Sequence, residues 1–299
     1  MINRRTVLVL GAGASAPYGF PTGRKLLLEA STLLASGHPP TLDLLSKIGI
    51  HANTPGDFAL LLKQSMQPSI DAFVENRPTY IDVGKAAIAL SLIPHENQHA
   101  IEERGLDKEW YEFLFTQVGP TVSDIEDSHL TVLTFNYDRS LEYFWYHAIV
   151  RSFGLDTART AALYGMMPII HLHGHLGLPH FKDADSRPYS PALDLKSLRI
   201  AVTSILIPGA ENIDNTPFTL ASKAIAEADV LCFLGFAFHF QNVKRLGLVS
   251  KGDRAIYASA FHLSENDISK AGALIPDPIT FGLQSQNALA FLENYPVLT

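Results

Sequence analysis

Short continuous runs of apolar residues recur along the chain, and the clearest of them end at a glycine or a polar turn. Continuous rather than alternating apolar runs are typical of parallel strands that are buried on both faces. The predicted strands are Thr6–Leu10, Leu130–Phe135, Pro168–Leu172, Val230–Leu234 and Ala255–Ala258. The run Ile200–Leu206 is a further strand candidate.

Helical periodicity follows several of these strands. From Asp138 to Val150 an apolar stripe recurs at helical spacing, and Asp138 is suited to cap the helix at its N-terminus. The stripe consists of Leu141, Phe144, Trp145 and Ala148. Strands that alternate with helices predict an α/β fold, a Rossmann-like doubly wound parallel sheet with crevices at the carboxyl ends of its strands.

The interval from about 25 to 125 differs, because it holds helical patterns and no strong strand. The expected helices are Leu26–Leu34, Asp57–Gln64, Ser69–Glu75, Ile81–Leu92 and Lys108–Phe115. We interpret this interval as a helical module inserted into a single domain that spans residues 1–299. The segment Pro179–Pro191, rich in Pro, Asp and Ser, predicts a surface loop.

Composition narrows the function classes. The chain has 299 residues, 47% hydrophobic and 18% charged, which suits a globular protein. A net charge of −7 and no basic run beyond Arg4–Arg5 argue against nucleic acid as the main ligand.

The run Thr6–Leu10 is too short for a secretion signal, and no apolar stretch suits a membrane span, so we expect a cytoplasmic protein. Cys232 is the single cysteine, which excludes an intrachain disulfide and a four-cysteine zinc site.

The first strand leads into a glycine turn, Gly11-Ala-Gly13-Ala-Ser15, followed by Gly19-Phe-Pro21-Thr-Gly23. Such a turn lets the backbone approach a pyrophosphate, whose negative charge the following N–H groups favour. It is not the dehydrogenase fingerprint, because position 16 is Ala and Glu29 comes too early to bind a ribose. A tight strand-to-helix turn without any ligand is the alternative interpretation.

Two later strands end in polar residues. Asn136-Tyr137-Asp138 follows the second strand, where active-site residues of open α/β sheets lie, although a turn former and a helix cap explain the same residues. His171, His173 and His175 would share one face if their strand persisted that far. We favour one functional and two packing histidines over a metal site, with the functional one acting as a general base.

A fourth segment runs from Ala228 through Gly235-Phe236 to His239 and Asn242. Gly235 falls where a strand ends and a ligand could approach the backbone; an ordinary buried strand with a turn is the alternative.

The order of these landmarks resembles the sirtuin superfamily over roughly residues 5 to 260. The landmarks are, in order, GAGAS with GxPxG, then TxNYD, then LHG and a strand ending in LGF. Their order is most similar to the prokaryotic, sirtuin-like NAD-hydrolase branch, whose members often serve in anti-phage defence. The segment Ser69-Ile-Asp71-Ala-Phe73 also resembles a helical segment of that branch.

The resemblance implies a set of site residues. NAD would be bound, as substrate, by Gly11, Ala12, Gly13, Ser15, Gly235 and Phe236. Gly11, Gly13 and Ser15 would hold its phosphates, and Gly235 would border the adenosine. Asn136 and Asp138 would orient the nicotinamide ribose and a water, and His173 would be the catalytic histidine, with no metal needed.

The chain also departs from the deacylase sirtuins. Their four-cysteine zinc ribbon cannot be built here, and Thr22-Gly23-Arg24 stands in place of their Asp-Phe-Arg. Both departures favour hydrolysis of NAD itself. His175 stands where deacylases have Ser after His-Gly, which leaves open which histidine is catalytic.

The leading hypothesis is therefore an NAD glycohydrolase that yields nicotinamide and ADP-ribose. The alternatives are protein deacylation or ADP-ribosyl transfer, and an NAD- or ADP-ribose-binding module without turnover. Because an unrestrained NAD hydrolase would harm its own cell, we expect regulation by homo-oligomerisation or by a separate regulatory protein.

Overall fold

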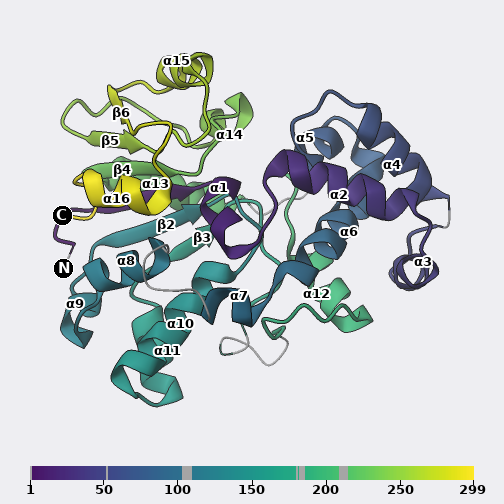
Figure 1. Cartoon of the computed structure of the whole chain (residues 1–299), viewed down its shortest axis with the longest axis horizontal. Helices are drawn as coiled ribbons and strands as arrows, with labels where there is room; N and C mark the ends of the chain where they lie inside the picture. The colour runs from purple at the N-terminus through teal and green to yellow at the C-terminus, as the bar shows by residue number, and fades with distance from the viewer. Residues whose placement is uncertain (1, 52, 103–109, 180, 182–185, 209–214) are drawn as a thin grey trace.

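A computed structural model describes residues 2–51, 53–102, 110–179, 181, 186–208 and 215–299. Its centre is a six-stranded sheet in the order β3-β2-β1-β4-β5-β6, and every neighbouring pair is parallel. The strands are β1 (Thr6–Leu10), β2 (Leu130–Thr134), β3 (Ile169–His171), β4 (Val230–Leu234), β5 (Ala255–Ala258) and β6 (Ile279–Phe281). Helices flank this sheet (Figure 1), which confirms the predicted α/β, Rossmann-like doubly wound fold.

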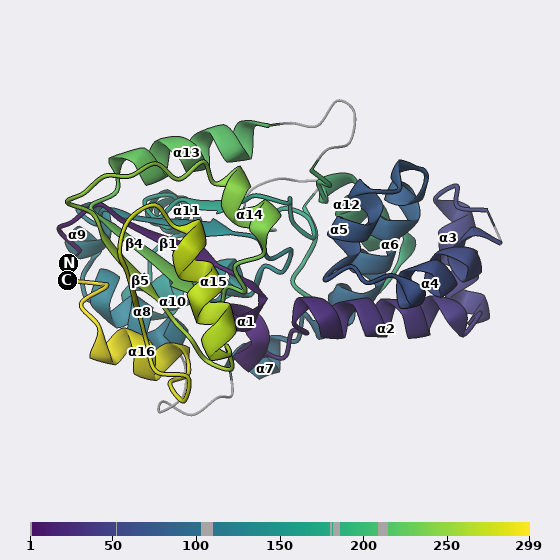
Figure 2. The same cartoon turned by 90° about the horizontal axis from the view of Figure 1, so that it is seen from above.

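The alternation of side chains along β1 divides the hydrophobic core into two layers. Leu8 and Leu10 belong to one cluster, which includes residues of α8 (Trp110–Val118), α10 (Ser140–Phe153) and α16 (Ala288–Asn294). Val7 and Val9 belong to the other cluster, with residues of α13 (Thr216–Glu227), α14 (Phe240–Arg245) and α15 (Glu265–Leu274). Figure 2 shows α13 and α16 on opposite sides of the sheet. Both faces of β1 are therefore buried, as its unbroken apolar run predicted.

Helices fill the interval between β1 and β2. They are α1 (Ala12–Ser15), α2 (Gly23–Ala35), α3 (Pro39–Lys47), α4 (Thr54–Gln64), α5 (Ile70–Glu75), α6 (Ile81–Leu92), α7 (Gln98–Glu102), α8 and α9 (Val122–Glu126). Helices α2 to α6 gather beside the sheet-bearing part of the molecule, whereas α8 and α9 lie close to the sheet (Figures 1 and 2). The helix expected over Lys108–Phe115 corresponds to α8, and residues 103–109 lie outside the described residues. The limits of the inserted module, about 25 to 125, stay a prediction.

One strand prediction is wrong. The run Ile200–Leu206 largely falls in a helix, α12 (Leu195–Ser204), whose N-cap Asp194 accepts a hydrogen bond from the backbone of Ser197. Leu198 and Ala201 are both buried and lie three residues apart, which is helical spacing. The Asp194 cap and the buried helical face favour a helix more than the β-branched residues of the run favour a strand.

The helix after β2 also starts later than expected. It begins at Ser140, and its N-cap position is Arg139 rather than Asp138. Asp138 still accepts a hydrogen bond from the backbone N–H of Ser140, at 3.1 Å, so its carboxylate satisfies a free donor of the first turn from one position upstream. The described part of Pro179–Pro191 contains no helix or strand, as predicted, but Arg187 and Tyr189 within it are buried and not at the surface. None of the helices in the described ranges combines the length and apolar character that a membrane crossing requires.

Candidate functional site

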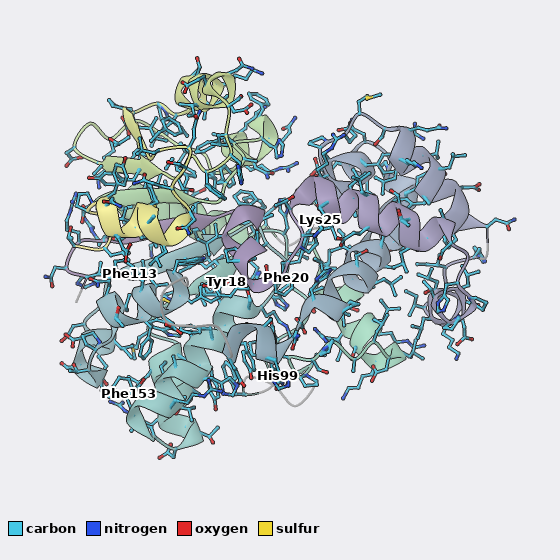
Figure 3. The ribbon with its side chains drawn as sticks, in the orientation of Figure 1. Tyr18, Phe20, Lys25, His99, Phe113 and Phe153 are labelled. Atoms are coloured by element: carbon cyan, nitrogen blue, oxygen red, sulfur yellow. The ribbon has the colours of Figure 1, made fainter. Side chains whose placement is uncertain are left out.

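A cavity of about 350 Å³ opens at the carboxyl ends of β1, β2, β4 and β5. The wall opposite the sheet is formed by the segment Phe20–Gly23, which leads into α2, and by the start of α5. Figure 3 shows Tyr18 and Phe20 between the sheet-bearing part of the molecule and helices α2 to α6. The cavity lies where β1 separates the two halves of the sheet, the usual ligand position in doubly wound folds, and its volume suits a small molecule. All the predicted site residues line it: Gly11, Ala12, Gly13, Ser15, Asn136, Asp138, His173, Gly235 and Phe236.

The glycines after β1 touch the turn after β4. The backbone N–H of Gly11 donates to the carbonyl of Leu234, and that of Gly13 donates to the carbonyl of Gly235, both at 3.0 Å. A methyl group at Gly11 would lie 2.6 Å from the carbonyl oxygen of Gly235. These glycines are thus required by the contact between two turns, and their own N–H groups are already donated within the protein. Ala12, at the first position of α1, has a backbone N–H without an intrahelical acceptor.

Both the side chain and the backbone of Asn136 form hydrogen bonds within the protein. Its side-chain Nδ2 donates to the carbonyl of Gly11 and to Oγ of Ser15, both at 2.9 Å, and its backbone N–H donates to Oγ1 of Thr134 at 3.0 Å. Its own carbonyl lies 2.8 Å from Nδ1 of His171. Because both amide hydrogens are committed, the side-chain Oδ1 is the atom left to accept a hydrogen bond from a ligand or a water.

Asp138 is buried beside this turn. Burial raises the pKa of its carboxyl group above the usual range, although hydrogen bonds from Ser140 and Ser15 oppose the shift. The hydroxyl of Ser140 donates to Oδ1 of Asp138, and Oγ of Ser140 in turn lies 2.7 Å from the hydroxyl of Tyr111. This chain fixes the start of α10 and the position of the carboxylate at the cavity wall.

His173 is 2% exposed, and its Nε2 atom is buried without a hydrogen-bond partner among the described residues. Its ring packs edge-on against Phe135, with the ring centroids 5.2 Å apart. Burial lowers the pKa of His173 to about 4, which the negative charge of Asp71 partly opposes and Arg245 reinforces. The imidazole is therefore neutral near pH 7, and a neutral imidazole can accept a proton.

The other two histidines lie elsewhere. The strand ends at His171, so the condition for a face shared by all three is not met. His171 and His175, with ring centroids 5.5 Å apart, line a second cavity together with Glu142, and His173 does not line it. Within the described ranges, no group of three or more His, Cys, Asp or Glu side chains is placed to hold a metal ion.

Sequence reasoning named no site residue on the inserted helices, yet Asp71 lines the cavity. Its carboxylate accepts a hydrogen bond from the hydroxyl of Tyr137, and its negative charge raises the pKa of both His173 and His239 against the effect of burial. Nearby, Glu75 of α5 pairs with Arg245 of α14 at 2.7 Å. The helix itself was expected over Ser69–Glu75, but only the likeness of Ser69–Phe73 to a family segment connected it with the site.

The carboxyl end of β5 was also missed. Ser259, Phe261 and His262 line the cavity, and Oγ of Ser259 accepts a hydrogen bond from the backbone N–H of Gly235 at 2.9 Å. His262 and Phe238 have positive φ angles, 60° and 53°, which non-glycine residues rarely adopt. Strained backbone of this kind concentrates at ligand sites. The rule that ligands bind at strand carboxyl ends could have selected these residues from the predicted strand Ala255–Ala258.

No protein-family model matches the chain, and no curated protein matches it either.

Proposed function

We propose that the protein is an NAD glycohydrolase, converting NAD and water to nicotinamide and ADP-ribose. The observation that carries the proposal is the convergence, in one cavity, of a neutral buried histidine, an asparagine with a single free acceptor atom, and the glycine turn. The order of sequence landmarks that resembles the sirtuin-like NAD hydrolases supports the same conclusion. By that resemblance the protein acts as an effector of anti-phage defence through NAD depletion.

The chemistry of this reaction suits the groups present. As the bond between nicotinamide and ribose breaks, the electron pair leaves with nicotinamide, which becomes neutral, and positive charge develops on the ribose. Water then adds to the ribose carbon and gives up a proton. Carboxylates at Asp138 and Asp71 stabilise positive charge nearby, and rigid placement lowers the barrier further.

Each side chain has a role that its contacts allow. In the proposal, Oδ1 of Asn136 accepts a hydrogen bond from the attacking water or from a ribose hydroxyl, because Nδ2 is already committed. Nε2 of His173 accepts the proton, and its low pKa keeps the acceptor available down to mildly acidic pH. The Gly11 and Gly13 N–H groups are occupied, so we assign pyrophosphate contact to the N–H of Ala12, at the first position of α1.

The test follows nicotinamide and ADP-ribose by chromatography after incubating the purified protein with NAD. Asn136→Ala and His173→Ala should each lower turnover by about 100-fold or more, as expected when a general base or its aligned water is lost. Asn76→Ala and His51→Ala, at exposed positions outside the cavity, are the matched controls. NAD binding measured by calorimetry without any turnover would instead support a binding module.

We further propose that activity depends on assembly, either of identical chains or with a separate regulatory protein. Turnover per chain should then rise with protein concentration or on addition of the partner. A monomer with full, concentration-independent turnover would contradict this part of the proposal and leave the hydrolase assignment intact.

A further inference from the structure

His171 is a buried imidazole with hydrogen-bond acceptors at both ring nitrogens. Its side chain is 6% exposed, Nδ1 lies 2.8 Å from the carbonyl oxygen of Asn136, and Nε2 contacts Oε1 of Glu142. A carbonyl oxygen can only accept, so Nδ1 must carry a hydrogen. Contact between Nε2 and a carboxylate oxygen likewise requires a proton between them.

The pair is best described as an imidazolium facing a carboxylate. Burial alone would lower the pKa of His171, but the charge and hydrogen bond of Glu142 outweigh burial and raise it; the Asn136 carbonyl and Asp138 add to the rise. For Glu142, burial alone would raise the pKa, and His171 together with His175 lowers it instead. Other titratable or charged groups also lie near the pair. Tyr164 of α11 (Thr157–Tyr164) lines the second cavity beside it, and a further small cavity, which Glu142 also lines, is lined by Arg139, Tyr143, His147 and Tyr189.

The partner of this imidazolium is a residue of the candidate site. Asn136 is the residue whose Oδ1 faces the proposed chemistry, and its backbone carbonyl has His171 Nδ1 as its donor. On the opposite side, its Nδ2 is fixed by Gly11 and Ser15. Loss of the His171 contact would free one side of the Asn136 peptide and let the amide rotate away from the geometry that the reaction needs.

We propose that His171 and Glu142 are positioning residues, a buried charged pair behind the sheet edge that fixes the Asn136 peptide and thereby orients its side-chain Oδ1 in the cavity. This inference rests on the proposed function for its effect on turnover. The positioning itself rests only on the contacts described above and can be measured without turnover.

Two substitutions at one position separate charge from hydrogen bonding. Glu142→Leu removes the acceptor at Nε2 and leaves a buried ring nitrogen unpaired. Glu142→Gln keeps a hydrogen-bonding partner, because its amide can donate to Nε2 of a neutral His171 while Nδ1–H still donates to Asn136. Glu102→Leu is the control, since it removes a carboxylate that pairs with Tyr143 and Arg151 instead.

With full-length protein and NAD, we expect Glu142→Leu and His171→Phe to lower kcat by about 10- to 100-fold with little change in KM, since orientation and not binding is lost. Glu142→Gln should recover most of the turnover lost in Glu142→Leu. In the wild type, kcat should fall as pH rises through the raised pKa of His171, because the deprotonated Nε2 then faces a carboxylate. This alkaline loss should be absent in Glu142→Gln.

Nuclear magnetic resonance gives a readout that does not depend on turnover. In protein labelled with ¹⁵N-histidine, His171 should keep the imidazolium pattern to a higher pH than an exposed histidine does, and should lose this difference in Glu142→Gln. The side-chain amide signals of Asn136, identified by their absence in Asn136→Ala, should stay in place in Glu142→Gln and move in folded Glu142→Leu. Wild-type protein that shows these signals but gives no turnover, even at high concentration and with the regulatory partner added, would reject the hydrolase assignment and keep the positioning. A His171 that loses the imidazolium pattern at no higher pH than an exposed histidine, or Asn136 signals unmoved in Glu142→Leu, would overturn the inference.

Discussion

Gly13 and Gly235 join the turns after β1 and β4 through direct backbone contact. The N–H of Gly13 donates to the carbonyl of Gly235 at 3.0 Å, and a methyl group on Gly235 would lie 2.4 Å from the carbonyl carbon of Gly13 and 2.1 Å from the backbone nitrogen of Ala14. Gly235 also has a φ of 59°, which side chains disfavour. The floor of the cavity is thus formed by two turns that only glycine allows to meet.

Gly235→Ala should therefore destabilise the protein by about 2 to 5 kcal/mol, the sum of a left-handed backbone and an overpacked contact. Gly154→Ala is the matched control, because Gly154 has the same φ of 59° but nothing within 4 Å of an added methyl group. It should cost only about 1 kcal/mol. Urea unfolding of both variants checks the difference; equal costs would show that the turns can separate at little expense.

The central strands of this fold could be predicted because burial on both faces makes them mostly apolar: β4 is wholly apolar, β1 is apolar after Thr6, and β2 contains two threonines among apolar residues. Strand β6 could not be predicted, because it is an edge strand in which Thr280 is exposed and Ile279 and Phe281 are only partly buried. The run Ile200–Leu206 was wrongly predicted as a strand because a short apolar run does not distinguish a buried strand from a helix, and the helix depends on the Asp194 cap.

Some residues of the candidate site could likewise be predicted from the sequence, and others could not. Asn136, Asp138 and His173 were predictable because each follows a strand whose carboxyl end could be recognised. Asp71 was not, because its contact with Tyr137 joins residues 66 positions apart, and no pattern within either segment encodes that pairing. The pairing of His171 was equally hidden, since a histidine that contacts Glu142 of α10, 29 positions earlier in the chain, looks the same in sequence as one that binds a metal.

The buried His173 should make folding sensitive to acid. Its pKa is about 4 in the folded protein and 6.5 when exposed, so the unfolded chain binds more protons between these values and stability falls as pH decreases through that window. Between pH 7 and pH 4.5 this loss amounts to about 2 kcal/mol. In His173→Gln that part of the loss should vanish in urea titrations. Identical curves for His173→Gln and wild type would show that His173 is accessible to protons in the fold.

The hydrogen bond between Tyr137 and Asp71 should couple α5 to the cavity. Tyr137→Phe leaves the partly buried carboxylate of Asp71 without this donor, which costs about 1.5 to 3 kcal/mol. Tyr143→Phe removes the same kind of bond, to Glu102, but Tyr143 does not line the site cavity. Both variants should lose stability, and only Tyr137→Phe should also weaken NAD binding, measured by calorimetry. Equal NAD affinity in the two variants would remove Asp71 and Tyr137 from the binding site.

Glu96 links Arg139, directly before α10, to Arg187 in the segment that follows His175. It is fully buried and accepts hydrogen bonds from Arg139, at 2.7 Å and 2.9 Å, and from Arg187, and both arginines are at most 2% exposed. Arg139 also donates to the carbonyls of Arg187 and Pro188. Two buried cations thus depend on one carboxylate.

Glu96→Gln keeps the shape of the side chain but leaves both guanidinium groups without a counter-charge. Since an uncompensated buried charge costs about 3 to 5 kcal/mol, unfolding should shift strongly to lower urea concentration. Asp43→Asn breaks the exposed pair with Lys47, at 2.6 Å, and should change the midpoint little, because water screens that pair. Arg139 directly follows Asp138, so Glu96→Gln should also lower turnover in protein that is still folded. Full stability in Glu96→Gln would mean that the backbone carbonyls around Arg139, and not the carboxylate, hold this network together.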